Sequence, residues 1–164
     1  MSFSLLTFCE WLNATAWSTA LREGDYPFPV IETLHIIGLG FSVGTIMWVD
    51  LRLLGLVMKK EKVSDVVSQL EPWAIGGFVI MFISGLLLLL SEPVKCYTAV
   101  AFRIKAVMLI MAGLNVLYFH SKVYGNVSEW DTAETMPWGA KFVGIMSFVL
   151  WFGIIVAGRW TAYL

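Results

Sequence analysis

The sequence predicts an all-α integral membrane protein whose four spans form one helical bundle. Three observations carry this prediction. The 164 residues are 59% hydrophobic and only 14% charged, and the mean hydropathy is +0.78, whereas soluble domains are about 45–50% apolar and about 25% charged. The apolar residues also fall into four long stretches, each bracketed by charged residues. The net charge of −1 argues against nucleic acid as a partner, because that interaction needs a basic surface.

The N-terminal segment, residues 1–26, has the pattern of an amphipathic helix rather than of a cleaved signal peptide. It lacks the basic n-region and the continuous apolar h-region of such a peptide. Apolar residues instead recur close to the helical period, at Phe3, Leu5, Leu6, Phe8, Trp11, Leu12, Ala16, Trp17 and Leu21. We expect either an interfacial helix with its tryptophans among the lipid headgroups or a helix packed across the end of the bundle. Pro27 and Pro29 then end this segment and allow a new helix to begin.

We expect the four spans at about residues 30–58, 72–91, 101–120 and 141–163 of a single membrane domain. A helix needs about 20 residues to cross the hydrocarbon core of a bilayer. Most of the charge-free stretches are shorter than this, so several ionisable residues are expected near or inside the apolar slab. Ionisable residues at such depth are candidates for function.

Orientation and assembly follow from basic residues and glycines. Lys59, Lys60 and Lys62 form the densest basic cluster, which predicts that the first loop is cytoplasmic. Both termini would then be periplasmic, with the protein in the cell inner membrane. Glycines such as Gly40 and Gly44 predict close helix packing, and the glycines of the first and fourth spans also suggest a homo-oligomer within the lipid bilayer.

Candidate metal ligands are few, because the chain has two histidines and two cysteines. Glu32 and His35 are three residues apart and therefore share a helical face. This spacing supplies two ligands from one helix in di-iron bundles, but a complete site needs a second such motif, which the sequence lacks. Without a Ser-His-Asp pattern, hydrolytic chemistry is also not expected.

The ionisable residues separate into two groups by depth. His35 and His120 are expected 20–25 Å apart along the membrane normal, from ~1.5 Å of rise per residue, so one haem iron cannot bind both. The outer group contains Glu32, His35, Glu92, Arg103, Lys105 and Arg159. The inner group contains Asp50, Arg52, Asn115 and His120, with Glu71 and Lys141 at the surface, and Asp50 and Arg52 are expected to form a structural pair.

A histidine among several cations, as in the outer group, fits haem b. The imidazole would supply an axial ligand to iron, and Arg or Lys side chains would bind the propionates. The alternative is that Glu32, Arg103 and Arg159 only neutralise one another between helices.

Five stretches of the sequence carry a family resemblance. They are residues 31–38 (IETLHIIG), 49–56 (VDLRLLGL), 102–105 (FRIK), 113–115 (GLN) and 157–159 (AGR). From about residue 8 to its end, the chain resembles an uncharacterised bacterial family of small four-helix membrane proteins. More distantly, the His-x-x-Gly helix at His35 looks like copper-resistance protein D and membrane protoporphyrinogen oxidase-like proteins. Members of the latter group hold haem b on helix histidines, which implies His35 as a haem ligand here.

The leading hypothesis is therefore a haem b-binding membrane protein with a redox or electron-transfer role, which would require a redox partner. His35 would bind the iron and Glu32 would orient it. The propionates would contact Arg103, Lys105 and Arg159, and His120 would belong to a separate site. The alternatives are a copper-binding protein that uses Glu32 and His35, or a structural accessory subunit. Whether the chain is an enzyme is left open.

Overall fold

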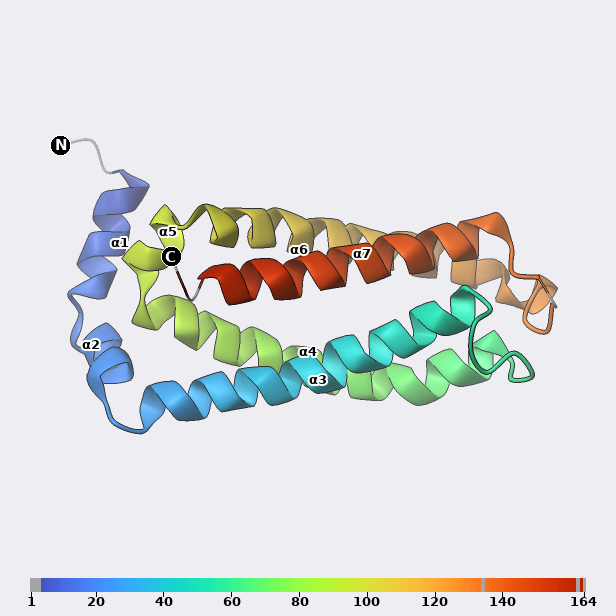
Figure 1. Ribbon diagram of the computed structural model, residues 1–164, viewed down its shortest axis with the longest axis horizontal. Helices are drawn as coiled ribbons and strands as arrows, with labels where there is room; N and C mark the ends of the chain where they lie inside the picture. Colours follow the sequence, from blue (N-terminus) through green and yellow to red (C-terminus); the bar gives the residue numbers. More distant parts are fainter. Residues whose placement is uncertain (1–3, 134, 162, 164) are drawn as a thin grey trace.

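The computed structural model describes residues 4–133, 135–161 and 163. Over these residues the chain forms helices and no strand, which confirms the predicted all-α class. Within the same residues four helical segments are long and apolar enough to cross a membrane. They are α3 (Pro27–Leu53), α4 (Val63–Ser91), α6 (Val100–Tyr118) with its continuation to Glu129, and α7 (Trp138–Thr161), and they lie side by side along the long axis of the molecule (Figure 1).

The N-terminal segment forms two short helices, α1 (Leu5–Asn13) and α2 (Ala16–Glu23), where one helix was expected. The division occurs at Thr15, whose side chain accepts a hydrogen bond from the Ser18 amide at 3.3 Å and so begins a new helix. Both helices stand across one end of the bundle (Figure 1), where α1 contacts α5 (Pro93–Thr98) and α2 contacts α3 and α4. The segment therefore packs across the bundle end.

The first span is shorter than expected at its C-terminal end, because α3 ends at Leu53. Gly55 follows with a φ of +71°, a conformation that glycine adopts without steric cost. The Leu56 amide donates to the Leu51 carbonyl at 3.0 Å, and the Gly55 amide donates to the Arg52 carbonyl at 2.9 Å. These two bonds form a Schellman motif, which ends the helix by satisfying its last carbonyl groups.

The second span begins earlier than expected, because α4 starts at Val63 and includes Pro72. Its N-terminus is capped from a distant part of the chain: the Asp131 carboxylate accepts bonds from the Ser64 amide at 2.8 Å and the Ser64 hydroxyl at 2.7 Å. Burial acts to raise the pKa of Asp131, but the bonds from Ser64 outweigh it, so the pKa lies below its ordinary value. This cap holds the α6–α7 connection against the α3–α4 connection.

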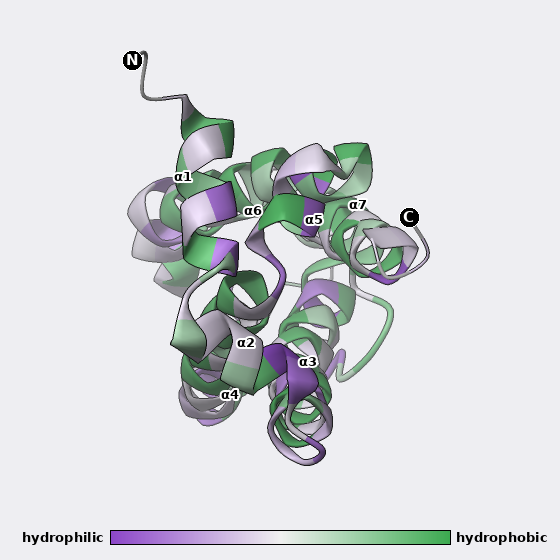
Figure 2. Cartoon of the chain, turned by 90° about the vertical axis from the view of Figure 1, so that its left-hand side faces the viewer, coloured by the Kyte–Doolittle hydropathy of each residue, from purple (hydrophilic) through white to green (hydrophobic). Residues whose placement is uncertain are grey.

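The long helices pack as two pairs, α3 with α4 and α6 with α7, and the pairs meet mainly through α3 and α7. Figure 2 views the bundle from the α1–α2 end, with α3 and α4 on one side and α6 and α7 on the other. A central buried cluster joins the pairs and includes Trp151, whose ring meets the Phe78 ring edge-on at 5.6 Å. A second cluster lies at the loop end and contains Leu53, Val63, Val67, Phe119, Val123, Met136, Ala140 and Val143.

Glycines set the α3–α4 spacing, but Gly40 and Gly44 are not among them. A Cβ atom on Gly77 would lie 2.5 Å from the Ser42 amide nitrogen, and one on Gly38 would lie 2.9 Å from the Met81 amide nitrogen. The two backbones therefore touch at Gly38 and Gly77. Around Gly40 and Gly44, by contrast, no described atom lies within 4 Å of an added Cβ, so this GxxxG face points away from the rest of the chain.

Candidate functional site

A groove with a volume of about 920 Å³ runs between α4 and α6. Its floor consists of α3 and α7 side chains such as Asp50, Ser147 and Trp151, which are buried, whereas α4 and α6 contribute exposed walls. Phe82 on α4 and Ile110 on α6, for example, are 69% and 66% exposed. Since these helices are apolar enough to lie in a bilayer, the groove opens sideways toward lipid.

The groove forms because the two helix pairs diverge on this side. Contacts between the pairs run chiefly through α3 and α7. The facing surfaces of α4 and α6 are therefore not packed closely against each other. Most lining side chains are aliphatic or aromatic. A cavity of this kind, apolar with a few polar groups, is typical of small-molecule sites, which measure about 300–1,000 Å³.

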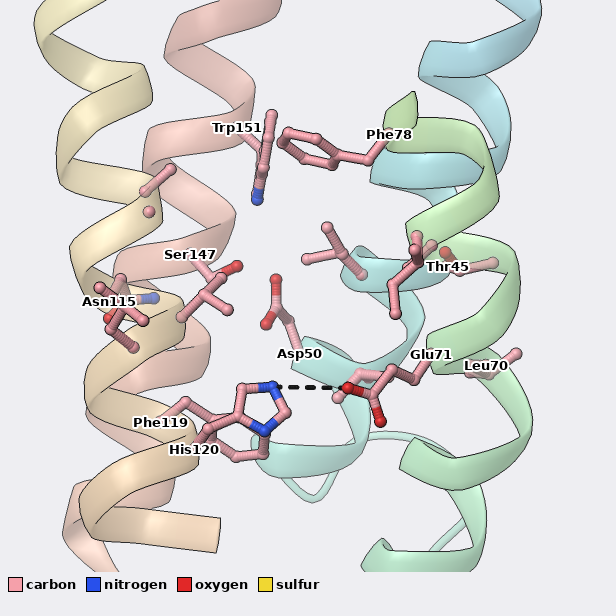
Figure 3. Close-up of a pocket in the computed structure, with 18 of the residues that line it drawn as sticks. Thr45, Asp50, Leu70, Glu71, Phe78, Asn115, Phe119, His120, Ser147 and Trp151 are labelled. Carbon is pink, nitrogen blue, oxygen red and sulfur yellow. Dashed lines mark ion pairs between the residues drawn. The ribbon is translucent and has the colours of Figure 1, made fainter. Parts of the chain in front are cut away.

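Asp50 is the most deeply buried acidic residue of the groove, with 3% of its surface exposed. Its carboxyl group points into the space between the helix pairs, toward the Ser147 hydroxyl on α7 (Figure 3). The second oxygen, Oδ2, has no hydrogen-bond partner within the part of the chain that the structure describes. A buried oxygen in this condition costs about 1–3 kcal/mol, so the geometry is that of an incomplete hydrogen-bonded site.

Arg52 does not complete that site, and the expected Asp50–Arg52 pair does not form among the described residues. Residues two apart on a helix face different directions. The Arg52 guanidinium is buried on the other side, where Nε and Nη2 donate to the Glu61 carbonyl at 3.1 and 2.6 Å. Arg52 therefore fastens the α3–α4 loop, and no described cation pairs with Asp50.

His120 and Glu71 form the second polar element, at the end of the groove nearest the α3–α4 loop. His120 Nε2 lies 3.9 Å from Glu71 Oε1, and both side chains are partly exposed, 41% and 44%. His120 belongs to a π-helical turn, η1 (Phe119–Val123), that continues α6. The ring packs edge-on against Phe119 at 5.1 Å, and Figure 3 shows it below the Asp50 carboxyl group.

The structure thus gathers the predicted inner group, apart from Arg52 and Lys141, around one groove. Asp50, Glu71, Asn115 and His120 all line it. The Asn115 side chain donates to the Val143 carbonyl at 3.1 Å and ties α6 to α7. Sequence reasoning missed Ser147, because one serine in an apolar helix gives no signal until its neighbour across the bundle is known.

His35, the leading candidate of the outer group, lies between α3 and α4. Its Nδ1 is 3.0 Å from the Ser84 hydroxyl, and the ring fits against Gly85, where an added Cβ would come within 3.0 Å of it. His35 and His120 therefore contact α4 at Ser84 and Glu71, roughly 20 Å apart at ~1.5 Å of rise per residue. The two imidazoles are therefore too far apart to bind one metal ion.

Lys105 and Glu32 lie within electrostatic range of His35. Lys105 is half-buried beside Gly158, and no hydrogen bond or ion pair holds its ammonium group in the described structure. Glu32 is exposed.

Arg103 and Arg159 turn away to nearby tyrosines. The Arg103 side chain donates to the Tyr97 carbonyl at 3.1 and 2.9 Å, and Arg159 donates to the Tyr163 hydroxyl at 2.7 Å. Ion pairs between these arginines and Glu32 are absent from the described residues. Nor do three His, Cys, Asp or Glu side chains gather to hold a metal ion anywhere in residues 4–133, 135–161 and 163.

Comparison with protein-family models gives a match that covers most of the chain. Residues 23–164 fit the model of a family described as a family of unknown function, DUF6644. No curated protein and no solved structure matches the chain with significance, so the expected likeness to copper-resistance protein D finds no support.

Proposed function

The chain belongs to the family DUF6644, and because that family has no assigned function, we propose one from the geometry: the protein binds a membrane-soluble amphiphile in the groove between α4 and α6. The apolar part of the ligand lies along the groove walls, and its polar head lies against Asp50, with Glu71 and His120 nearby. The observation that carries this proposal is the buried Asp50 Oδ2 without a hydrogen-bond partner in the described structure.

A bound head group would remove the free-energy cost of leaving the buried Asp50 Oδ2 without a hydrogen bond. Buried polar atoms are almost always hydrogen-bonded, and Asp50 faces a cavity large enough for a ligand rather than a packed neighbour. A head group that donates a hydrogen bond or carries positive charge would satisfy Oδ2. The Ser147 hydroxyl and the His120 ring are placed to contact the same head group.

The setting favours entry from the membrane. The exposed apolar walls of α4 and α6 support direct exchange with the lipid bilayer, so the ligand need not cross water. We place the protein in the cell inner membrane, with the basic loop at Lys59 in the cytoplasm by the positive-inside rule and both termini in the periplasm. The groove's polar end, next to this loop, would then lie on the cytoplasmic side.

Occlusion of the groove tests the proposal. Gly113 lines the groove, and an added Cβ there meets no described atom within 4 Å. The indole of Gly113→Trp therefore starts from open space and should occupy part of the groove. Gly76→Trp is the matched control, because Gly76 is equally open but lies outside the groove. Native mass spectrometry should detect a co-purified small molecule on the wild type and on Gly76→Trp, and not on Gly113→Trp. Equal retention by all three proteins, or none on the wild type, would refute the proposal.

A second candidate function is haem b binding at His35, with electron transfer to a redox partner. It is favoured by Lys105, a half-buried cation that lies within electrostatic range of His35 and has no hydrogen-bond or ion-pair partner in the described structure. Such a cation suits a propionate. The Ser84 contact at 3.0 Å fixes one ring nitrogen of His35, as is common for ligating histidines. Copper is less well supported, because Glu32 and His35 would supply only two ligands.

The pyridine haemochrome of purified variants tests this candidate. His35→Ala should lose all haem, His120→Ala should keep it, and Arg159→Ala should weaken retention. A colourless wild type after expression with added haem precursor, or loss only in His120→Ala, would reject a haem site at His35.

We also propose that the protein is a homo-oligomer. The support is the GxxxG face of Gly40 and Gly44, which is open in the described chain and of the kind that brings membrane helices together. The mass of the protein released from a mild detergent tests this, and a monomer at every concentration would contradict it.

A further inference from the structure

We propose that the ligand of the groove is a lipophilic cation, which binds at Asp50 in exchange for a proton. This inference rests on the proposed function and names the chemical class of its ligand. It is argued from the charge of the groove, the burial of Asp50 and the aromatic side chains that line the groove.

The charged groups of the groove have one sign. Two carboxyl groups line it, those of Asp50 and Glu71, together with the His120 imidazole, and the described lining residues include no Lys or Arg. An anionic head group would therefore meet two acids and no fixed cation. Charge complementarity selects a positively charged ligand.

Asp50 cannot remain ionised in an empty groove at low cost. An ionised carboxyl group away from water is strongly disfavoured unless it is paired, and the nearby guanidinium of Arg52 is directed to the Glu61 carbonyl. In the empty groove the carboxyl group therefore carries a proton. When a cation binds, that proton leaves for bulk water, so one positive charge replaces another and the net charge of the site is unchanged.

The remaining lining residues favour an organic cation over a metal ion. In Figure 3, Trp151 and Phe78 lie above Asp50, whereas His120 lies below it. Phe119 lines the groove next to His120. Aromatic faces attract organic cations within about 6 Å. Ca²⁺ and Mg²⁺ require about six oxygen ligands, and the polar part of this groove does not provide so many.

Titration of the site involves a small set of groups. Those that line the groove with Asp50 are Glu71 on α4 and His120 on η1; the polar lining residues of α6 and α7 are Asn115 and Ser147, which do not ionise. The Glu71–His120 pair lies between Asp50 and the exposed end of the groove.

Two ions of the same shape and opposite charge test the proposal: tetraphenylphosphonium and tetraphenylborate. Binding is measured with the full-length protein in phosphatidylcholine nanodiscs, with empty nanodiscs subtracted. The wild type should bind the cation at least about tenfold more tightly than the anion. Its affinity for the cation should rise with pH, by up to about tenfold per pH unit where Asp50 is protonated. Asp50→Asn should lose about tenfold or more, whereas Asp65→Asn, an exposed acid outside the groove, should bind like the wild type.

Proton release gives a readout that does not depend on a variant. Addition of tetraphenylphosphonium to the wild type in weak buffer should release up to one proton per bound cation. Equal binding of the two ions, pH-independent affinity or no proton release would each overturn the inference. If an adduct sensitive to Gly113→Trp is nevertheless present, the amphiphile-binding function stands and only the cationic class is wrong.

Discussion

The close approach of α3 and α4 makes Gly77 a position where one methyl group should matter. In Gly77→Ala the added Cβ would lie 2.5 Å from the Ser42 amide nitrogen, 2.8 Å from the Phe41 Cβ and 2.9 Å from the Gly38 carbonyl oxygen. Carbon atoms in ordinary contact are about 3.5–4.0 Å apart. Two of these three neighbours are backbone atoms, which cannot rotate away, so the helices must separate by roughly 1 Å.

The expected cost follows from overpacking. Forcing an extra methyl group into a packed interface costs about 1–3 kcal/mol, whereas replacing a helical glycine by alanine returns about 0.5–1 kcal/mol. Gly77→Ala should therefore lower the free energy of unfolding by about 0.5–2 kcal/mol. The neighbouring Gly76 is the control, because an added Cβ there meets no described atom within 4 Å. Gly76→Ala should be neutral or raise the free energy of unfolding by up to about 1 kcal/mol.

Reversible unfolding in mixed detergent–SDS micelles, followed by circular dichroism, measures both variants. The two substitutions are adjacent and chemically identical, so their effects on the unfolded chain cancel in the comparison. The reasoning predicts a gap of about 1–3 kcal/mol between them. Equal stabilities would show that α3 and α4 do not touch at Gly77.

Three further predictions concern the loop end of the bundle. Arg52→Leu should lower the free energy of unfolding by about 1.5–3 kcal/mol in the same assay, because two hydrogen bonds from a buried guanidinium to Glu61 are lost; no change would remove Arg52 as the anchor of the loop. The pKa of Asp131 is below its ordinary value in the folded protein, so its cap on Ser64 should persist above pH ~4 and be lost as the pH falls through the lowered value. Exchange of the Ser64 amide measures this, and Asp131→Asn should abolish the acid step; an unchanged step would exclude Asp131 as its source. A cysteine at Lys60, in a background without Cys9 and Cys96, should resist an impermeant reagent added to intact cells, and labelling from outside would reverse the proposed orientation.

Composition and helical period were sufficient to predict the fold class. Four apolar stretches without strand signals leave helices as the way to satisfy the backbone in lipid. The helix ends were less accessible, because they depend on contacts that a linear pattern does not show. Gly55 ends α3 through a left-handed turn, and Asp131 starts α4 from a distant loop, so α4 includes Pro72 instead of beginning there.

For the candidate site, the sequence predicted only the depth of each residue along the membrane normal. Counting residues correctly separated His35 from His120 and placed Asp50, Asn115 and His120 at one level. Depth does not specify direction around a helix axis. Arg52 shares that level with Asp50 yet points to the loop, and the expected pair therefore failed. The groove itself was not predictable, because it arises where the two helix pairs diverge. Most of its lining residues are aliphatic or aromatic, like those elsewhere in the four helices.

The central claim, that the groove holds a ligand drawn from the membrane, is tested most directly by site-specific photo-cross-linking. Phe82 lines the groove and is 69% exposed, while Phe152 is 62% exposed and lies outside it, so a photoreactive phenylalanine at either position meets lipid equally. Mass spectrometry of the protein irradiated in native membranes should find one small-molecule adduct enriched at position 82 over position 152, and Gly113→Trp should remove it. The same bulk phospholipid at both positions, or a cross-link from position 82 to a second copy of the chain, would contradict the account.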